Sequence, residues 1–168
     1  MRTKVAFSNS HKGGRMSGTR DSCTCARCQA QCAHKPGWLI PRDVDRIAAY
    51  LGLSVEQLFS CLLVVDVWSG RRRDIYTLSP AIEHIEAGGV LEVSAYTGRC
   101  VFLVNGLCSI HEVKPYECRR AFHEKDGRNA HAVAMLAWSS RRHQTTIHDL
   151  LDEIHALRRP SPFKGEVL

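Results

Sequence analysis

Long apolar segments are missing from this 168-residue sequence, in which no run approaches the roughly 18 residues that span a bilayer. The first twenty residues also lack the apolar stretch of about 7–15 residues that marks a secretory signal. We therefore expect a cytoplasmic protein with no membrane segment. In that reducing compartment, clustered cysteines bind metals or act in catalysis more often than they form disulfides.

Several motifs that identify common enzymes are absent as well. The sequence contains no P-loop, no GxGxxG fingerprint, no Ser-His-Asp elbow and no HExxH pattern. A broad excess of positive charge is also lacking, because residues 1–20 carry +5 of the total of +6 and the rest has 18 basic and 17 acidic side chains. A nearly neutral body lacks the basic face that phosphate-backbone binding requires, which argues against nucleic acid as a partner.

Cysteine, in contrast, is abundant and clustered. Seven of the eight cysteines form two groups with the spacings C-x-C-x2-C-x3-C and C-x7-C-x9-C, namely Cys23, Cys25, Cys28 and Cys32, followed by Cys100, Cys108 and Cys118. Neighbouring cysteines seldom meet the geometry of a disulfide, but thiolates one to three residues apart can converge on one metal. A redox pair at Cys25 and Cys28 would normally follow a strand, whereas a polar tail precedes it here. We therefore interpret all seven as metal ligands.

The spacing leaves the identity of the metal open. A structural zinc takes four ligands, so seven thiols exceed one zinc site. The first group approaches the bacterial ferredoxin run C-x2-C-x2-C-x3-C-P, but one residue is missing from its first gap and Ala33 replaces the proline. An iron–sulfur cluster and zinc, including two ions bridged by sulfurs, are both compatible with these thiolates. Because the two groups are far apart in the chain, we expect metal binding to help define the fold.

The length and patterning predict one small α+β domain, with short strands, a hairpin and several helices organised around the cysteine-rich site. This metal-binding domain is expected over residues 22–158, between a flexible basic tail at 1–21 and a flexible C-terminal tail at 159–168. The first cysteine group shows no helical or strand period and is therefore expected on an irregular loop that ends at Pro36-Gly37.

Local signals predict the remaining elements in chain order. We expect a helix that begins at Pro41 and is ended by Gly52, then a second helix that begins with the capping box of Ser54 and Gln57. Strands follow at 63–68 and 75–78 around a solvated Arg71–Arg73 turn, then a hairpin with its turn at Asn105-Gly106 and a short helix with Cys118 on its inner face. The last expected element is an amphipathic helix with apolar residues at Ile147, Leu150, Leu151, Ile154 and Leu157, extended upstream by Val133, Leu136 and Trp138.

Other residues that could contribute to the site have simpler interpretations. Cys61 lies in an apolar stretch and is expected in the core as a small hydrophobe. The histidines nearest the cysteines are expected around the ligands or on the surface, namely His34, His111 and His123. The histidines of the last helix, His148 and His155, are expected on a solvated face. Arg119 and Arg120 follow Cys118, where they could stabilise thiolate charge or form ion pairs with Glu117 or Glu124.

Further motifs accompany the cysteines: Pro36-Gly37-Trp38-Leu39, Gly98-Arg99-Cys100-Val101-Phe102-Leu103, Gly106-Leu107-Cys108-Ser109-Ile110-His111-Glu112 and Lys114-Pro115-Tyr116-Glu117-Cys118-Arg119. In combination, over residues 23–123, they resemble the YkgJ-type cysteine-cluster family of zinc- or iron-chelating domains. The resemblance implies metal chelation by both cysteine groups. The usual family motif is C-x2-C-x2-C-C, whereas here Cys28 and Cys32 are three residues apart and Cys23 is additional.

Three functions follow from these features. The leading one is a metal-chelating protein whose ligands are Cys25, Cys28, Cys32, Cys100, Cys108 and Cys118, joined by Cys23. The second is an iron–sulfur enzyme for redox or methyl-transfer chemistry, since some flagellin lysine methylases look like relatives of the family; it would need a pocket, expected at Trp38, Trp138, Arg119 and His123. The third is a zinc-stabilised module that binds protein or nucleic acid.

Overall fold

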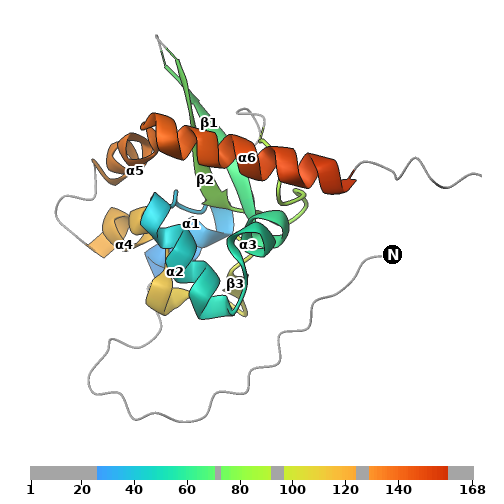
Figure 1. The fold of residues 1–168 in the computed structure, drawn as a ribbon. Helices are drawn as coiled ribbons and strands as arrows, with labels where there is room; N and C mark the ends of the chain where they lie inside the picture. The colour runs from blue at the N-terminus through green and yellow to red at the C-terminus, as the bar shows by residue number, and fades with distance from the viewer. Residues whose placement is uncertain (1–25, 71–72, 92–96, 124–128, 159–168) are drawn as a thin grey trace, which may run out of the picture.

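The computed structural model describes residues 26–70, 73–91, 97–123 and 129–158 (Figure 1). Within them, six α-helices and one 3-10 helix accompany two antiparallel strand pairs, which confirms the predicted α+β fold. The elements are α1 (Ala26–His34), α2 (Pro41–Leu51), α3 (Val55–Leu62), β1 (Leu63–Ser69), β2 (Asp74–Pro80), β3 (Leu103–Val104), β4 (Leu107–Cys108), η1 (His111–Val113), α4 (Tyr116–His123), α5 (Ala130–Trp138) and α6 (Arg141–Arg158). None of the described helices is long and apolar enough to cross a membrane. The tails expected at 1–21 and 159–168, and Arg71 and Arg72 of the expected turn, lie outside the described residues.

The hydrophobic core lies between the β1–β2 hairpin and the helices packed around it. The two strands pair in register from Leu63 opposite Pro80 to Ser69 opposite Asp74, and α6 crosses them in Figure 1. Leu63 and Val65 of β1, Phe59 of α3 and Ile147 of α6 are fully buried in this core. Burial of such side chains stabilises the fold by about 1.5–3 kcal/mol each.

The two helices predicted after the first cysteine group are confirmed, together with the residues that begin and end them. Pro41 occupies the first turn of α2, and Gly52 ends that helix in the left-handed conformation with φ of 67°. Ser54 and Gln57 form the expected reciprocal cap of α3: the Gln57 N–H donates to Ser54 Oγ at 3.1 Å, and the Ser54 N–H donates to Gln57 Oε1 at 2.9 Å.

The hairpin predicted at Asn105-Gly106 is present but short. Asn105 and Gly106 have φ angles of 50° and 78°, as a two-residue type I′ turn requires. Only two cross-strand residue pairs flank the turn, Leu103 with Cys108 and Val104 with Leu107. Cys100 precedes the paired strands and instead forms an isolated bridge with Ile82.

Two predictions about helices were wrong. Residues 26–34 form α1 instead of a loop, because most of this segment consists of strong helix formers, namely alanine, glutamine and arginine. The C-terminal apolar pattern is divided between α5 and α6, which Ser139 separates as the C-cap of α5. Of the residues assigned to the buried stripe, Val133, Leu136 and Leu157 are exposed. Leu157 lies ten positions after Ile147, which places it at the edge of the apolar face of α6.

A buried carboxylate joins α2 to α4, the helix that carries Cys118. Asp43 is 1% exposed, and its Oδ2 accepts the N–H groups of Ile40 at 3.1 Å and Tyr116 at 2.6 Å. Its Oδ1 lies 3.0 Å from the Arg46 guanidinium and 3.3 Å from the Arg119 guanidinium. One carboxylate thus satisfies N–H groups at the starts of two helices, which would otherwise lack partners in the helix.

Replacing this carboxylate should therefore destabilise the whole domain. We expect Asp43→Asn to lower the free energy of unfolding by about 3 kcal/mol, because it removes a buried charge from two guanidinium partners. The measurement is urea denaturation followed by circular dichroism. Asp45→Asn is the matched control, since Asp45 is an exposed carboxylate of the same helix; its effect should stay within about 0.5 kcal/mol. Equal effects of the two substitutions would contradict the role assigned to Asp43.

Candidate metal centre

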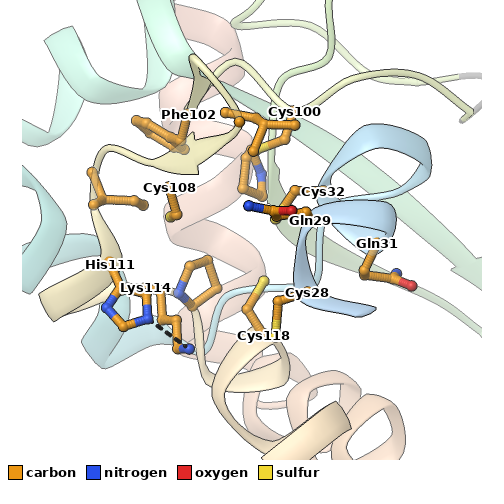
Figure 2. Close-up of a pocket in the computed structure, with 15 residues that line it drawn as sticks. Cys28, Gln29, Gln31, Cys32, Cys100, Phe102, Cys108, His111, Lys114 and Cys118 are labelled. Carbon is orange, nitrogen blue, oxygen red and sulfur yellow. Dashed lines mark hydrogen bonds between the residues drawn. The ribbon is translucent and has the colours of Figure 1, made fainter. Parts of the chain in front are cut away.

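Five of the seven predicted ligands line one pocket. Figure 2 shows the side chains of this thiol pocket, which contains Cys28, Cys32, Cys100, Cys108 and Cys118. The cavity has a volume of about 40 Å³. Side chains such as Phe102 and Ile110 make part of its wall apolar, while Gln29, His111 and Lys114 contribute polar groups. The structure therefore brings thiols from both cysteine groups to the same place.

The first cysteine group reaches the pocket from α1. Cys28 and Cys32 are four residues apart on this helix, so they occupy the same face and project toward the pocket in Figure 2. Backbone hydrogen bonds attach α1 directly to the second group. The Cys100 N–H donates to Cys32 O at 2.8 Å, and the Gly98 N–H donates to His34 O at 2.7 Å. These contacts set the position of Cys100 relative to α1 independently of any thiol.

The hairpin positions Cys100 and Cys108. Cys108 belongs to β4 and pairs with Leu103, so the tight turn returns the chain to the pocket that Cys100 enters. The Leu103 N–H also donates to Cys100 O at 2.9 Å, which makes a compact turn before the hairpin. The predicted proximity of these two cysteines therefore arises from two consecutive turns.

Cys118 reaches the pocket because α4 packs very closely against the segment after α1. A Cβ atom at Gly37 would lie only 2.9 Å from Cys118 Sγ and 3.0 Å from its backbone nitrogen. Next to this contact, the Trp38 N–H donates to Glu117 Oε2 at 2.6 Å, while Glu117 Oε1 lies 3.1 Å from Nδ1 of His131 on α5. Glycine at position 37 is what permits this approach.

The environment of Cys100 and Cys118 favours the neutral form of these two thiols. Burial raises the pKa of Cys100 to about 12, with smaller contributions from Cys32 and Cys108. Burial also raises the pKa of Cys118 well above its ordinary value, and Cys32, Cys100 and Cys108 add to the shift. The pocket alone thus disfavours thiolates at neutral pH.

The thiols line the same pocket, but their sulfur atoms are not arranged around one point as metal ligands would be. In the described part of the chain, no three His, Cys, Asp or Glu side chains converge closely enough to hold a metal ion. Cys23 and Cys25, the other two predicted ligands, lie outside the described residues. Metal binding therefore requires rotation of cysteine side chains whose backbones already surround the pocket.

Cys61 is not in the core, contrary to the prediction. It is exposed on α3 and does not line the thiol pocket. Leu58 and Phe59 are the buried residues of this helix, and Cys61 follows Phe59 by two positions, about 200° around the helix axis. Its Sγ lies 3.6 Å from Ser60 Oγ.

The aromatic pocket expected for an enzyme is not formed by the predicted tryptophans. Trp38 and Trp138 are buried, and neither lines the thiol pocket. Their indole N–H groups donate to Asp66 Oδ2 at 2.8 Å and to Leu39 O at 2.7 Å. The side chain of His123 is outside the described part of the structure.

Arg119, the first of the two arginines after Cys118, has a partner that the sequence did not predict. Arg119 pairs with the buried Asp43, whereas the sequence suggested Glu117 or Glu124. Arg120 lies over the ring of Tyr116, with its guanidinium carbon 5.5 Å from the ring centroid. A single sequence could not reveal Asp43 as the partner, because that residue lies 76 positions away.

Among the histidines whose side chains the structure describes, His111 is the one that lies in the pocket wall. His34 is exposed at the end of α1, and His148 and His155 are exposed on α6, as predicted. Sequence analysis missed Lys114 and Gln29 as pocket residues. The available signal was closeness in sequence, since Lys114 precedes Cys118 by four residues and Gln29 follows Cys28 directly.

Comparison with known proteins identifies a family for most of the chain. Residues 24–137 match the CxxCxxCC family, described as a "putative zinc- or iron-chelating domain". The chain belongs to this family. The match confirms the resemblance inferred from the motifs, and it covers every described cysteine of the pocket as well as Cys25, while Cys23 precedes it. No curated protein and no solved structure matches the chain.

The contact between Gly37 and Cys118 can be tested by adding one methyl group. We expect Gly37→Ala to destabilise the domain by about 1–3 kcal/mol, because the new Cβ would overlap Cys118 and displace α4. Gly89→Ala is the control, since its nearest contact would be 3.9 Å away. Thermal unfolding measures both; a Gly37→Ala protein as stable as the control would show that α4 does not need this close approach.

Proposed function

We propose that this protein binds iron or zinc in the thiol pocket, with Cys28, Cys32, Cys100, Cys108 and Cys118 as ligands and Cys23 and Cys25 added by the segment before α1. The observation that carries the proposal is that five thiols, from segments up to 90 residues apart, line one pocket. Membership of a zinc- or iron-chelating family supports the same function. Thiolates are the ligands that zinc and iron–sulfur clusters share.

The residues of the pocket fit a thiolate-bound metal. Its described wall contains five sulfurs and one imidazole, and no carboxylate, the ligand type that calcium and magnesium prefer. Of the pocket cysteines, Cys100 is buried and the other four are half-buried. A bound metal cation would reverse the preference of Cys100 and Cys118 for the protonated form, because coordination stabilises the thiolate.

The number of thiols favours a site with more than one metal atom. A single tetrahedral zinc uses four ligands. It would leave one of the five described pocket thiols unused, and three of the seven predicted ligands unused. An iron–sulfur cluster, or two zinc ions with bridging sulfurs, accounts better for the excess. We place this activity in the reducing cytoplasm, where the thiols would remain available for metal.

The first experiment is purification without oxygen, followed by elemental analysis and absorption spectroscopy of one sample. We expect more than one metal atom per chain. Iron with acid-labile sulfide and a broad visible band would identify an iron–sulfur cluster, whereas a colourless protein with two zinc ions would identify a zinc cluster. One zinc ion per chain would contradict the polynuclear site, and a protein that binds neither metal would contradict chelation itself.

A pair of cysteine substitutions tests which thiols bind. We expect Cys118→Ser to lose at least half of the bound metal and to unfold at a lower temperature, because its thiol lines the pocket. Cys61→Ser is the matched control and should keep the wild-type metal content, since Cys61 is exposed outside the pocket. Full metal content in the Cys118→Ser protein, or loss of metal in the control, would refute the assigned ligand set.

A further inference from the structure

The thiol pocket contains a positive charge that metal chelation alone does not explain. Among the described residues that line it, Lys114 carries the only formal charge, since no aspartate, glutamate or arginine is present in the wall. The remaining lining residues are the cysteines, amides, one histidine, one glycine and apolar side chains. Lys114 is half-buried, so its aliphatic stem can line the apolar wall while its ammonium group remains partly hydrated.

The backbone of Lys114 is held in place by the buried carboxylate network. Arg46 Nη2 donates to the carbonyl groups of Val113 and Lys114, each at 3.1 Å, and the same guanidinium pairs with Asp43. Two residues later, the Tyr116 N–H donates to Asp43 Oδ2. The backbone therefore contacts α2 at Lys114 and on both sides of it, and it has little freedom to move relative to the pocket.

The side chain of Lys114 is directed by His111. Lys114 Nζ lies 3.4 Å from His111 Nε2, and the two side chains lie on the side of the pocket opposite α1 in Figure 2. Both residues line the same cavity as the five thiols. An ammonium group has three N–H donors, so contact with one imidazole nitrogen leaves donors that can interact with sulfur.

We propose that Lys114 supplies the countercharge of the metal-bound thiolates. This inference rests on the proposed metal binding and adds a residue that is not a ligand. Four thiolates around one zinc ion leave a net charge of about −2, and each further thiolate adds another negative charge. In an apolar pocket this excess is costly, and a cation nearby reduces the cost. Lys114 thereby strengthens the binding of a thiolate-rich, negatively charged metal centre.

The inference predicts a specific loss when the charge is removed. We expect Lys114→Met, which keeps a long apolar side chain, to weaken metal binding about tenfold, the effect of a change of roughly 1.4 kcal/mol. Lys114→Arg should restore most of the affinity because it restores the charge. Lys35→Met is the matched control: Lys35 is an exposed lysine that does not line the pocket, and its removal should have little effect.

Affinity is measured by competition between the protein and a chelator for zinc, at about 0.1 M and about 1 M salt, where the Debye length is roughly 10 Å and 3 Å. The loss in Lys114→Met should persist at high salt, because a partly buried charge is weakly screened. Urea unfolding of the metal-free proteins should be nearly unchanged by the substitution, which separates the charge effect from a folding defect.

Three outcomes would overturn the role of Lys114 while leaving metal binding intact. They are wild-type affinity in Lys114→Met, an equal loss in Lys35→Met, and failure of Lys114→Arg to recover affinity. Failure of the wild-type protein to bind zinc or iron would instead refute the proposed function, and the inference with it. The wild-type sample in this titration, together with the metal analysis of the wild-type protein purified without oxygen, distinguishes these cases.

Discussion

The buried carboxylate of Asp43 is the interaction on which the rest of the site depends. It accepts N–H groups from the first turns of α2 and α4 and pairs with two guanidinium groups, so it couples a segment near residue 40 to one near residue 116. Through Arg46 it also holds the carbonyl of Lys114. A charge this deeply buried is stable only with such a complete set of partners, which makes the arrangement of α4 sensitive to each of them.

The fold and a bound metal favour opposite protonation states of the same thiols. Burial raises the pKa values of Cys100 and Cys118, so the pocket stabilises neutral sulfur, whereas a metal requires thiolate. Coordination would therefore have to supply enough energy to deprotonate these buried thiols. If Lys114 supplies the proposed countercharge, its ammonium group reduces that requirement without occupying a coordination position.

Local signals predicted much of the fold because the interactions that create it are short in range. The capping box at Ser54, the glycine that ends α2 and the Asn105-Gly106 turn each depend on residues within four positions of one another. The same reasoning failed at α1, where two cysteines one helical turn apart were interpreted only as ligands. It failed again at Cys61, because an apolar neighbourhood in sequence does not show which face of a helix is buried.

The sequence by itself determined the chemistry of this protein: two groups of cysteines, a family of metal-chelating domains and a mixed fold of short elements. Side-chain type and spacing are enough for such conclusions. Tertiary structure alone decided which residues surround the thiols, since Lys114 and His111 enter the pocket while Trp38 and Trp138 turn into the core. The reason is that these placements depend on contacts between residues tens of positions apart, which no local pattern encodes.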